Sequence, residues 1–101
     1  MLIKDLYNIE DAYQCKNNNR ALELFNKLRD KIGNTHTVYR NTRLLSGRQF
    51  ATSHNAISYI KNKDYTNAIR EVYDFLDNYG DNEHELTDAE YAVLTCILDI
   101  V

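Results

Sequence analysis

Apolar side chains recur every three or four residues along most of this chain, which is the spacing of one face of an α-helix. The pattern is strongest in the stretch YTNAIREVYDFLDNYG, residues 65–80. Its apolar positions are Tyr65, Ala68, Ile69, Val72, Phe75, Leu76 and Tyr79. Gly80 follows them, and a glycine at that place typically ends a helix. The stretch predicts an amphipathic helix that buries its apolar face against a neighbour from the same chain.

The first third of the chain predicts a helical hairpin. One stripe covers residues 2–16 and consists of Leu2, Leu6, Ile9 and Tyr13, with Ile3 and Ala12 beside them. Three asparagines, Asn17 to Asn19, then supply side chains that cap helices and form turns. The second stripe ends at Gly33 and consists of Ala21, Leu24, Phe25, Leu28 and Ile32.

Residues 47–61 form a weaker pattern. Phe50, Ile57 and Ile60 share one face of a helix. Polar residues dilute that face, namely Thr52, Ser53 and Asn55. We predict a helix here that buries Phe50, Ile57 and Ile60.

The end of the chain predicts a last helix from residue 88 to about residue 100. Thr87 and Glu90 have the spacing of a capping box, in which each side chain bonds to a free backbone N–H at the start of a helix. The apolar positions cover most of the helix circumference, and they are Tyr91, Val93, Leu94, Ile97, Leu98, Ile100 and Val101. The helix is therefore either packed deeply within the chain or shared with a partner chain.

Residues that break helices are scarce. The 101 residues include no proline and three glycines, and 44% of the side chains are hydrophobic. This length suits one core and is too short for two. The prediction is one all-α domain, residues 1–101, with about five helices in antiparallel hairpins joined by short connections.

The two hairpins resemble one another weakly. When Ala21 is aligned with Ala68, Leu22 falls on Ile69 and Gly33 falls on Gly80. An internal repeat of about 47 residues explains this match. Chance explains it as well, because amphipathic helices that end in glycine share such features.

Four residues of the second hairpin, Ala56, Tyr59, Tyr65 and Ala68, resemble the tetratricopeptide pattern of small and aromatic residues on two antiparallel helices. The match covers about a quarter of the chain. The sequence departs from that family in having Thr52 and Asn55 where bulky apolar residues are preferred, Phe75 where a small one is preferred, and Gly80 in place of a proline. The resemblance implies a short tetratricopeptide-like repeat and, by analogy, a surface that binds proteins. Since such repeats usually need three units, the last helix is expected to cap the stack or to form a homodimer.

Charge is distributed unevenly along the chain, although the net charge is −3. The first thirty residues are neutral overall. Residues 31–63 hold six basic residues and no acid, and residues 64–101 hold ten acids with Arg70 as their one basic residue.

Three interpretations of this polarity are open. The acidic segment folds over the basic one and neutralises it, or one of the two segments faces a partner. A basic surface would bind phosphate groups through Tyr39, Arg40, Arg43 and Arg48. An acidic surface would bind a basic protein, and its residues are Asp74, Asp77, Asp81, Glu83, Glu85 and Asp88, with Tyr73 exposed beside them. Tyr39 and Tyr73 are the tyrosines that we expect to be exposed.

The sequence does not indicate catalysis, a metal site or a cofactor. His36, His54 and His84 are not spaced as metal ligands, and no phosphate-binding glycine loop or nucleophile motif occurs. Cys15 and Cys96 lie at helix-like apolar positions, which predicts reduced core residues. No apolar run approaches the roughly 18 residues of a membrane span, so we expect a cytoplasmic protein without a membrane partner.

These patterns together favour a non-enzymatic protein–protein interaction module. The asparagine-rich, tryptophan-free composition is typical of low-GC bacteria and their phages, which suggests a phage or mobile-element accessory protein that binds and inhibits a host factor. The first alternative is a nucleic-acid-binding protein that uses the basic segment 31–63. A less favoured alternative is a protein that sequesters a small anionic ligand.

Overall fold

The computed structural model describes residues 2–6, 16–33, 47–78 and 83–101. Within these residues the chain forms five α-helices and no strand. The helices are α1 (Ile3–Leu6), α3 (Asn18–Ile32), α4 (Gly47–Lys61), α5 (Tyr65–Asp77) and α6 (Asp88–Leu98). The predicted all-α class with about five helices is confirmed. The predicted helix over residues 2–16 is described only in its first turn, as α1, and residues 7–15 lie outside the described part.

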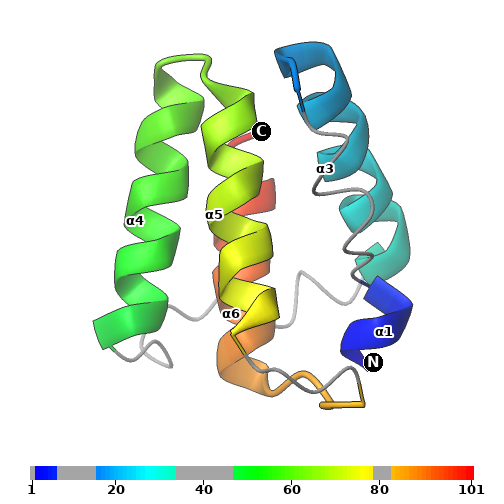
Figure 1. Ribbon diagram of the computed structural model, residues 1–101. Helices are drawn as coiled ribbons and strands as arrows, with labels where there is room; N and C mark the ends of the chain where they lie inside the picture. Colours follow the sequence, from blue (N-terminus) through cyan, green and yellow to red (C-terminus); the bar gives the residue numbers. More distant parts are fainter. Residues whose placement is uncertain (1, 7–15, 34–46, 79–82) are drawn as a thin grey trace.

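Helices α4 and α5 form an antiparallel hairpin with a three-residue connection (Figure 1). The backbone N–H of Lys63 donates to the carbonyl of Ile60 at 2.9 Å, and that of Asp64 donates to the carbonyl of Tyr59 at 2.8 Å. This pair of bonds is the Schellman motif, which places its central residue in the left-handed region. Here that residue is Lys63, with φ of 59°, where glycine is usual. Asp64 then caps α5 by accepting from the N–H of Asn67.

Helix α3 begins and ends as its sequence predicts. The Asn17 side chain accepts from the backbone N–H of Arg20 at 2.9 Å, which caps the helix. The helix ends at Gly33, whose positive φ of 61° suits a residue without a Cβ. Its buried residues are the predicted stripe, Ala21, Leu24, Phe25, Leu28 and Ile32.

Helix α6 starts with the predicted capping box. The Thr87 hydroxyl accepts from the N–H of Glu90 at 3.3 Å, and the Glu90 carboxylate accepts from the N–H of Thr87 at 3.2 Å. The helix ends at Leu98, slightly before the predicted end. Eight of its 11 residues are buried within a single chain, so deep packing accounts for its apolar circumference.

The helices lie around one core (Figure 1). Helix α5 packs between α3 and α4, and α4 also packs against α6. Ala21, Ala56 and Ala68 are fully buried, and such small side chains allow helices to approach closely. A guanidinium of α3 also reaches the end of α6, where Arg29 Nη2 donates to the carbonyl of Leu98 at 2.9 Å. That contact places a cation at the partly negative end of the helix.

Helices α3 and α5 run in the same direction, because their first turns are bonded together. The Asn18 side chain donates to the carbonyl of Lys63 at 2.9 Å and accepts from the backbone N–H and the hydroxyl of Thr66 at 3.3 and 3.1 Å. A stack of two helical hairpins would place its equivalent helices parallel to each other. The helix that precedes α3 in the predicted first hairpin lies mostly outside the described residues.

Two predicted side-chain positions are wrong. Phe50 is 59% exposed rather than buried with Ile60 and the half-buried Ile57, because α4 buries the small residues Thr52, Ser53 and Ala56 against its neighbours. Those residues leave no space for a phenyl ring on that side. Tyr73 is 5% exposed rather than on the surface, because α5 has neighbours on two sides and its buried face is wider than a simple stripe.

Candidate functional site

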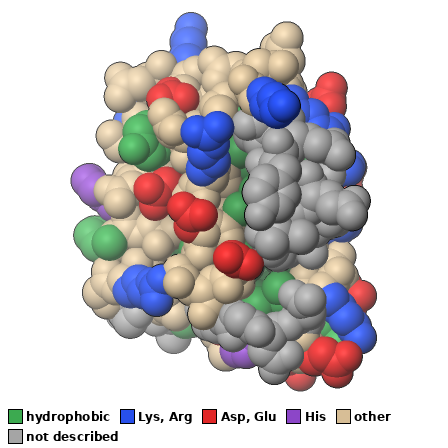
Figure 2. Space-filling view, in the orientation of Figure 1, with side chains coloured by type: hydrophobic (Ala, Val, Ile, Leu, Met, Phe, Trp, Pro, Cys, Tyr) green, Lys and Arg blue, Asp and Glu red, His purple; other side chains and the backbone are tan. Residues whose placement is uncertain are grey.

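Five exposed carboxylates lie near the C-terminal end of α5 and the N-terminal end of α6. They are Asp74, Asp77, Glu83, Glu85 and Asp88, and together they are called the acidic end below. Figure 2 shows acidic side chains on the exposed face of α5. The sequence also predicted Asp81 and Tyr73 for this surface. Asp81 lies outside the described residues, and Tyr73 is buried and therefore does not belong to it.

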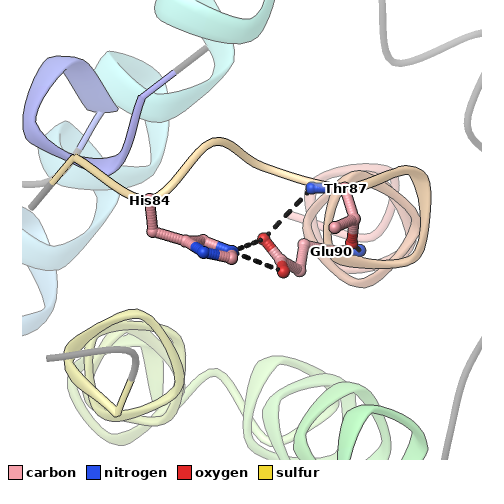
Figure 3. Close-up of polar contacts among 3 residues, drawn as sticks. All are labelled: His84, Thr87 and Glu90. Atoms are coloured by element: carbon pink, nitrogen blue, oxygen red, sulfur yellow. Dashed lines mark hydrogen bonds and ion pairs between the residues drawn. The ribbon is translucent and has the colours of Figure 1, made fainter. Parts of the chain in front are cut away.

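The segment before α6 is held by a buried carboxylate (Figure 3). Glu90 is only 3% exposed, and its two carboxylate oxygens lie 2.8 and 3.0 Å from Nε2 of His84. The same carboxylate accepts the N–H of Thr87. The imidazole of His84 therefore turns towards α6, while its two neighbours, Glu83 and Glu85, are exposed.

The other side of this segment is bonded to the beginning of the chain. The backbone N–H of Ile3 donates to the carbonyl of His84 at 2.9 Å, and Leu2 forms an isolated antiparallel bridge with Glu85. The Lys4 ammonium lies 3.1 Å from the carboxylate of Glu83. These contacts fix the backbone that presents two carboxylates of the acidic end.

Asp74 and Asp77 lie where a helix does not favour negative charge. Both belong to the last turn of α5, which has no basic residue. The carbonyl groups at that end carry a partial negative charge, so nearby carboxylates are repelled. Among the described residues, neither aspartate has an ion-pair partner. Asp88 differs, because it lies in the first turn of α6, where the partial charge is positive.

The predicted phosphate-binding residues are only partly described. Tyr39, Arg40 and Arg43 lie outside the described residues, and Arg48 is exposed in the first turn of α4. Lys31, Lys61 and Lys63 are exposed too, and none of these four cations has an ion-pair partner in the described part of the chain. The described residues of the basic segment are therefore not neutralised by the acidic one.

The structure describes one of the two cysteines, Cys96. Burial and the nearby Asp99 raise the pKa of the Cys96 thiol, so the thiol is protonated near neutral pH and is a weak nucleophile. Cys96 is free, as predicted, but only partly buried, and Cys15 lies outside the described residues. Among the described residues, no three histidine, cysteine, aspartate or glutamate side chains cluster as metal ligands. The His84–Glu90 pair instead positions the segment before α6.

Comparison of the chain with protein-family models, with curated protein sequences and with solved structures gives no match. The tetratricopeptide resemblance therefore stays a prediction. Of its four residues, Ala56 and Ala68 are fully buried, and Tyr59 and Tyr65 pack partly buried against the core. Among the described helices, none combines the length and the hydrophobicity that crossing a bilayer requires.

Sequence reasoning missed two side-chain pairs. One is the contact between His84 and Glu90, for which the capping box gave only the position of the glutamate. The other is a stack of two rings on α4, formed by Phe50 and His54. Their spacing of four residues is the available signal, because such residues are neighbours on a helix surface.

Proposed function

We propose that the protein is a non-enzymatic, cytoplasmic interaction module whose acidic end binds a basic surface of a partner protein. One observation carries the proposal. Asp74 and Asp77 are exposed, have no ion-pair partner among the described residues, and lie at the end of α5 where they destabilise the helix. Residues that lower stability without a local gain are typical of functional surfaces.

The acidic end acts mainly through electrostatics. The large hydrophobic side chains that are exposed in the described part are Phe50 and Ile100, and neither belongs to the acidic end. Complementary charge speeds the encounter of two proteins and fixes their relative orientation. Binding at this surface is therefore expected to weaken as the salt concentration rises.

The proposed consequence of binding is occlusion. A partner with a basic surface that contacts nucleic acid would lose access to that ligand when the acidic end covers it. This is how a small phage or mobile-element accessory protein would inhibit a host factor without chemistry of its own. The composition of the chain supports such an origin, and the acidic end supports the basic partner.

The test compares two variants of equal charge with the wild type. The double variant Asp74→Asn/Asp77→Asn neutralises the acidic end on α5, and the control Glu23→Gln/Asp30→Asn neutralises two exposed acids on α3. Each bait is used for affinity purification from low-GC bacterial hosts, and captured proteins are quantified by mass spectrometry. We expect a basic protein that the wild type and the control retain and that the α5 variant loses.

The stability of the α5 variant makes the result interpretable. Because the two aspartates oppose the helix dipole, their neutralisation should raise the free energy of unfolding, so lost capture cannot be attributed to unfolding. Equal capture by all three baits would contradict a role for the acidic end.

The predicted homodimer through α6 remains a proposal of its own. Within α6 and the residues after it, Ile100 is the large hydrophobic residue left exposed. Sedimentation equilibrium over a wide concentration range tests it. A mass that stays at 11.8 kDa would exclude the dimer.

A further inference from the structure

The exposed side of α4 carries two stacked aromatic rings. The centroids of Phe50 and His54 are 6.3 Å apart and their planes differ by 11°. That separation lies within the range of offset-stacked aromatic pairs. Phe50 is 59% exposed, although a phenyl ring gains free energy by burial. The pair therefore presents a flat apolar ring at the surface.

The charged side chains of α4 itself are all basic. Helix α4 contains no aspartate or glutamate, and Arg48 and Lys61 lie near its two ends. Lys63 follows in the connection to α5, and all three cations are exposed. Phe50, His54 and Lys61 lie on one side of the helix, because spacings of four and seven residues return to the same side. Arg48 does not share this side, because it lies about 160° around the helix axis from Phe50. At a rise of about 1.5 Å per residue, Phe50 and Lys61 are about 16 Å apart along the helix.

Lys63 holds its position at the expense of stability. Its φ of 59° is a left-handed conformation that is unfavourable for a residue with a side chain. Glycine is the usual residue at this place in the motif. A lysine here adds a second cation, after Lys61, at the end of the α4 face.

We propose that this α4 face binds single-stranded nucleic acid, with a base stacked on Phe50 and phosphates near Lys61 and Lys63. Every base has a π-face, so stacking on an exposed aromatic side chain together with nearby cations binds single strands without sequence preference. The site uses none of the residues of the acidic end and none of the predicted phosphate-binding set.

Other occupants fit this face less well. A second copy packed through the same face would bring the cations of the two α4 helices together, and like charges repel. A protein interface usually buries about 800 Å² on each partner around an apolar centre. Phe50 is the one large hydrophobic residue exposed on α4. One exposed ring is sufficient to stack on a base, but it is too small to form the apolar centre of a protein interface.

The test is fluorescence anisotropy of the full chain with labelled single-stranded oligonucleotides of mixed sequence, as RNA and as DNA, at low salt. We expect saturable binding by the wild type and a loss of affinity of roughly tenfold for Phe50→Ala, because a stacked base contributes on the order of 1–3 kcal/mol. Phe50→Tyr keeps the ring and should retain the affinity. Both variants should fold, since the side chain lies largely in solvent.

The cations have a separate signature. Lys61→Gln and Lys63→Gln should each lower the slope of log affinity against log salt by about 0.7, the value for one phosphate contact on a single strand. Lys27→Gln, an exposed lysine on α3, is the matched control and should leave the slope unchanged. The variant Asp74→Asn/Asp77→Asn should bind the oligonucleotide more tightly, because two repelling charges are removed, whereas it should lose the protein partner proposed above.

Three outcomes would overturn the proposal: no binding of either oligonucleotide by the wild type, equal affinity of the wild type and Phe50→Ala, or equal binding of poly-glutamate. The last would assign the face to an acidic protein. A preference for RNA over DNA would support the proposal and would indicate a contact with the 2′-hydroxyl.

Discussion

Helices α3 and α5 begin alike and end differently. Their N-caps, Asn17 and Asp64, lie 47 positions apart, and each accepts from the N–H three residues on. Four residues after each cap lies an alanine with no exposed surface, Ala21 in α3 and Ala68 in α5. The two helices run parallel and contact each other along one side. Their first turns are therefore equivalent in capping and in packing.

The last turns have opposite charge. Helix α3 ends with Arg29 and Lys31 in its last turn, where cations are favourable, and α5 ends with Asp74 and Asp77, where carboxylates are unfavourable. Capping and close packing constrain the beginnings of both helices in the same way. The ends differ in the charge that they expose to solvent. The second hairpin therefore differs from the first at the acidic end.

The largest expected effect tests whether the two helices contribute equally to the core. Leu28 and Phe75 occupy equivalent positions, and both are buried. We expect Leu28→Ala to lower the free energy of unfolding by about 2–5 kcal/mol and Phe75→Ala by about 3–5 kcal/mol, because each leaves a cavity. Urea unfolding followed by circular dichroism measures both. A loss below about 1 kcal/mol for either variant would contradict equal contributions of α3 and α5 to one core.

The next test concerns two helix ends with positive φ. Gly33 ends α3 with φ of 61° and ψ of −146°, a region that essentially only glycine occupies. An added Cβ would meet no atom within 4 Å, so Gly33→Ala should lose about 1–3 kcal/mol from backbone strain alone.

Lys63→Gly should act in the opposite direction at the end of α4. It removes a left-handed penalty of roughly 1–2 kcal/mol and adds about 0.5–1 kcal/mol of chain entropy, for a net gain below about 1 kcal/mol. Thermal unfolding of both variants measures the difference. Two changes of the same sign would contradict the backbone conformations given above.

The N-caps test the equivalence of the first turns. Asn17→Ala and Asp64→Ala should each lower the free energy of unfolding by about 1 kcal/mol, because each leaves a backbone N–H without its acceptor. Asn19→Ala, an exposed residue of α3, is the control and should change stability by less than about 0.5 kcal/mol. Loss at only one cap would show that the beginnings of α3 and α5 are not equivalent.

The smallest expected effect concerns the helix dipoles. Asp77→Asn removes a charge from the end of α5 and should raise the free energy of unfolding by about 0.3–1 kcal/mol, whereas Asp88→Asn removes a charge from the start of α6 and should lower it by a similar amount. Both substitutions change the net charge equally, so each controls the other. The comparison requires low ionic strength, and the difference should shrink as salt is added.

The boundaries of α3 and the start of α6 are predictable because each has both a stripe and a cap in its sequence. Helix α5 instead ends at Asp77, before the end that Gly80 predicts, and Gly80 lies outside the described residues. Gly33 and the capping box of Thr87 and Glu90 mark two of these ends directly. The orientation of α4 is not predictable in this way. A pattern treats Phe50 as a core residue, but the helix buries small side chains such as Ser53 because α5 and α6 approach it closely.

The candidate site shows the same division. Exposure of Asp74 and Asp77 follows from their position opposite the apolar stripe of α5, and sequence alone indicates it. The burial of Tyr73 depends on how the neighbouring helices pack against α5, and the contact of His84 with Glu90 depends on how the segment before α6 packs. Contacts between elements that are distant in sequence are not encoded in the periodicity of either element.

The bond from Ile3 to His84 also constrains the order of assembly on the ribosome. The contacts that join α4 to α5 are local, and the hairpin is free to form as soon as it emerges, since closing a short connection is fast. Helix α1 is synthesised before every other helix that the structure describes, yet the residues bonded to its start, His84 and Glu85, emerge among the last. Translation from the N-terminus therefore leaves the backbone N–H of Ile3 without this acceptor until residue 84 has been synthesised.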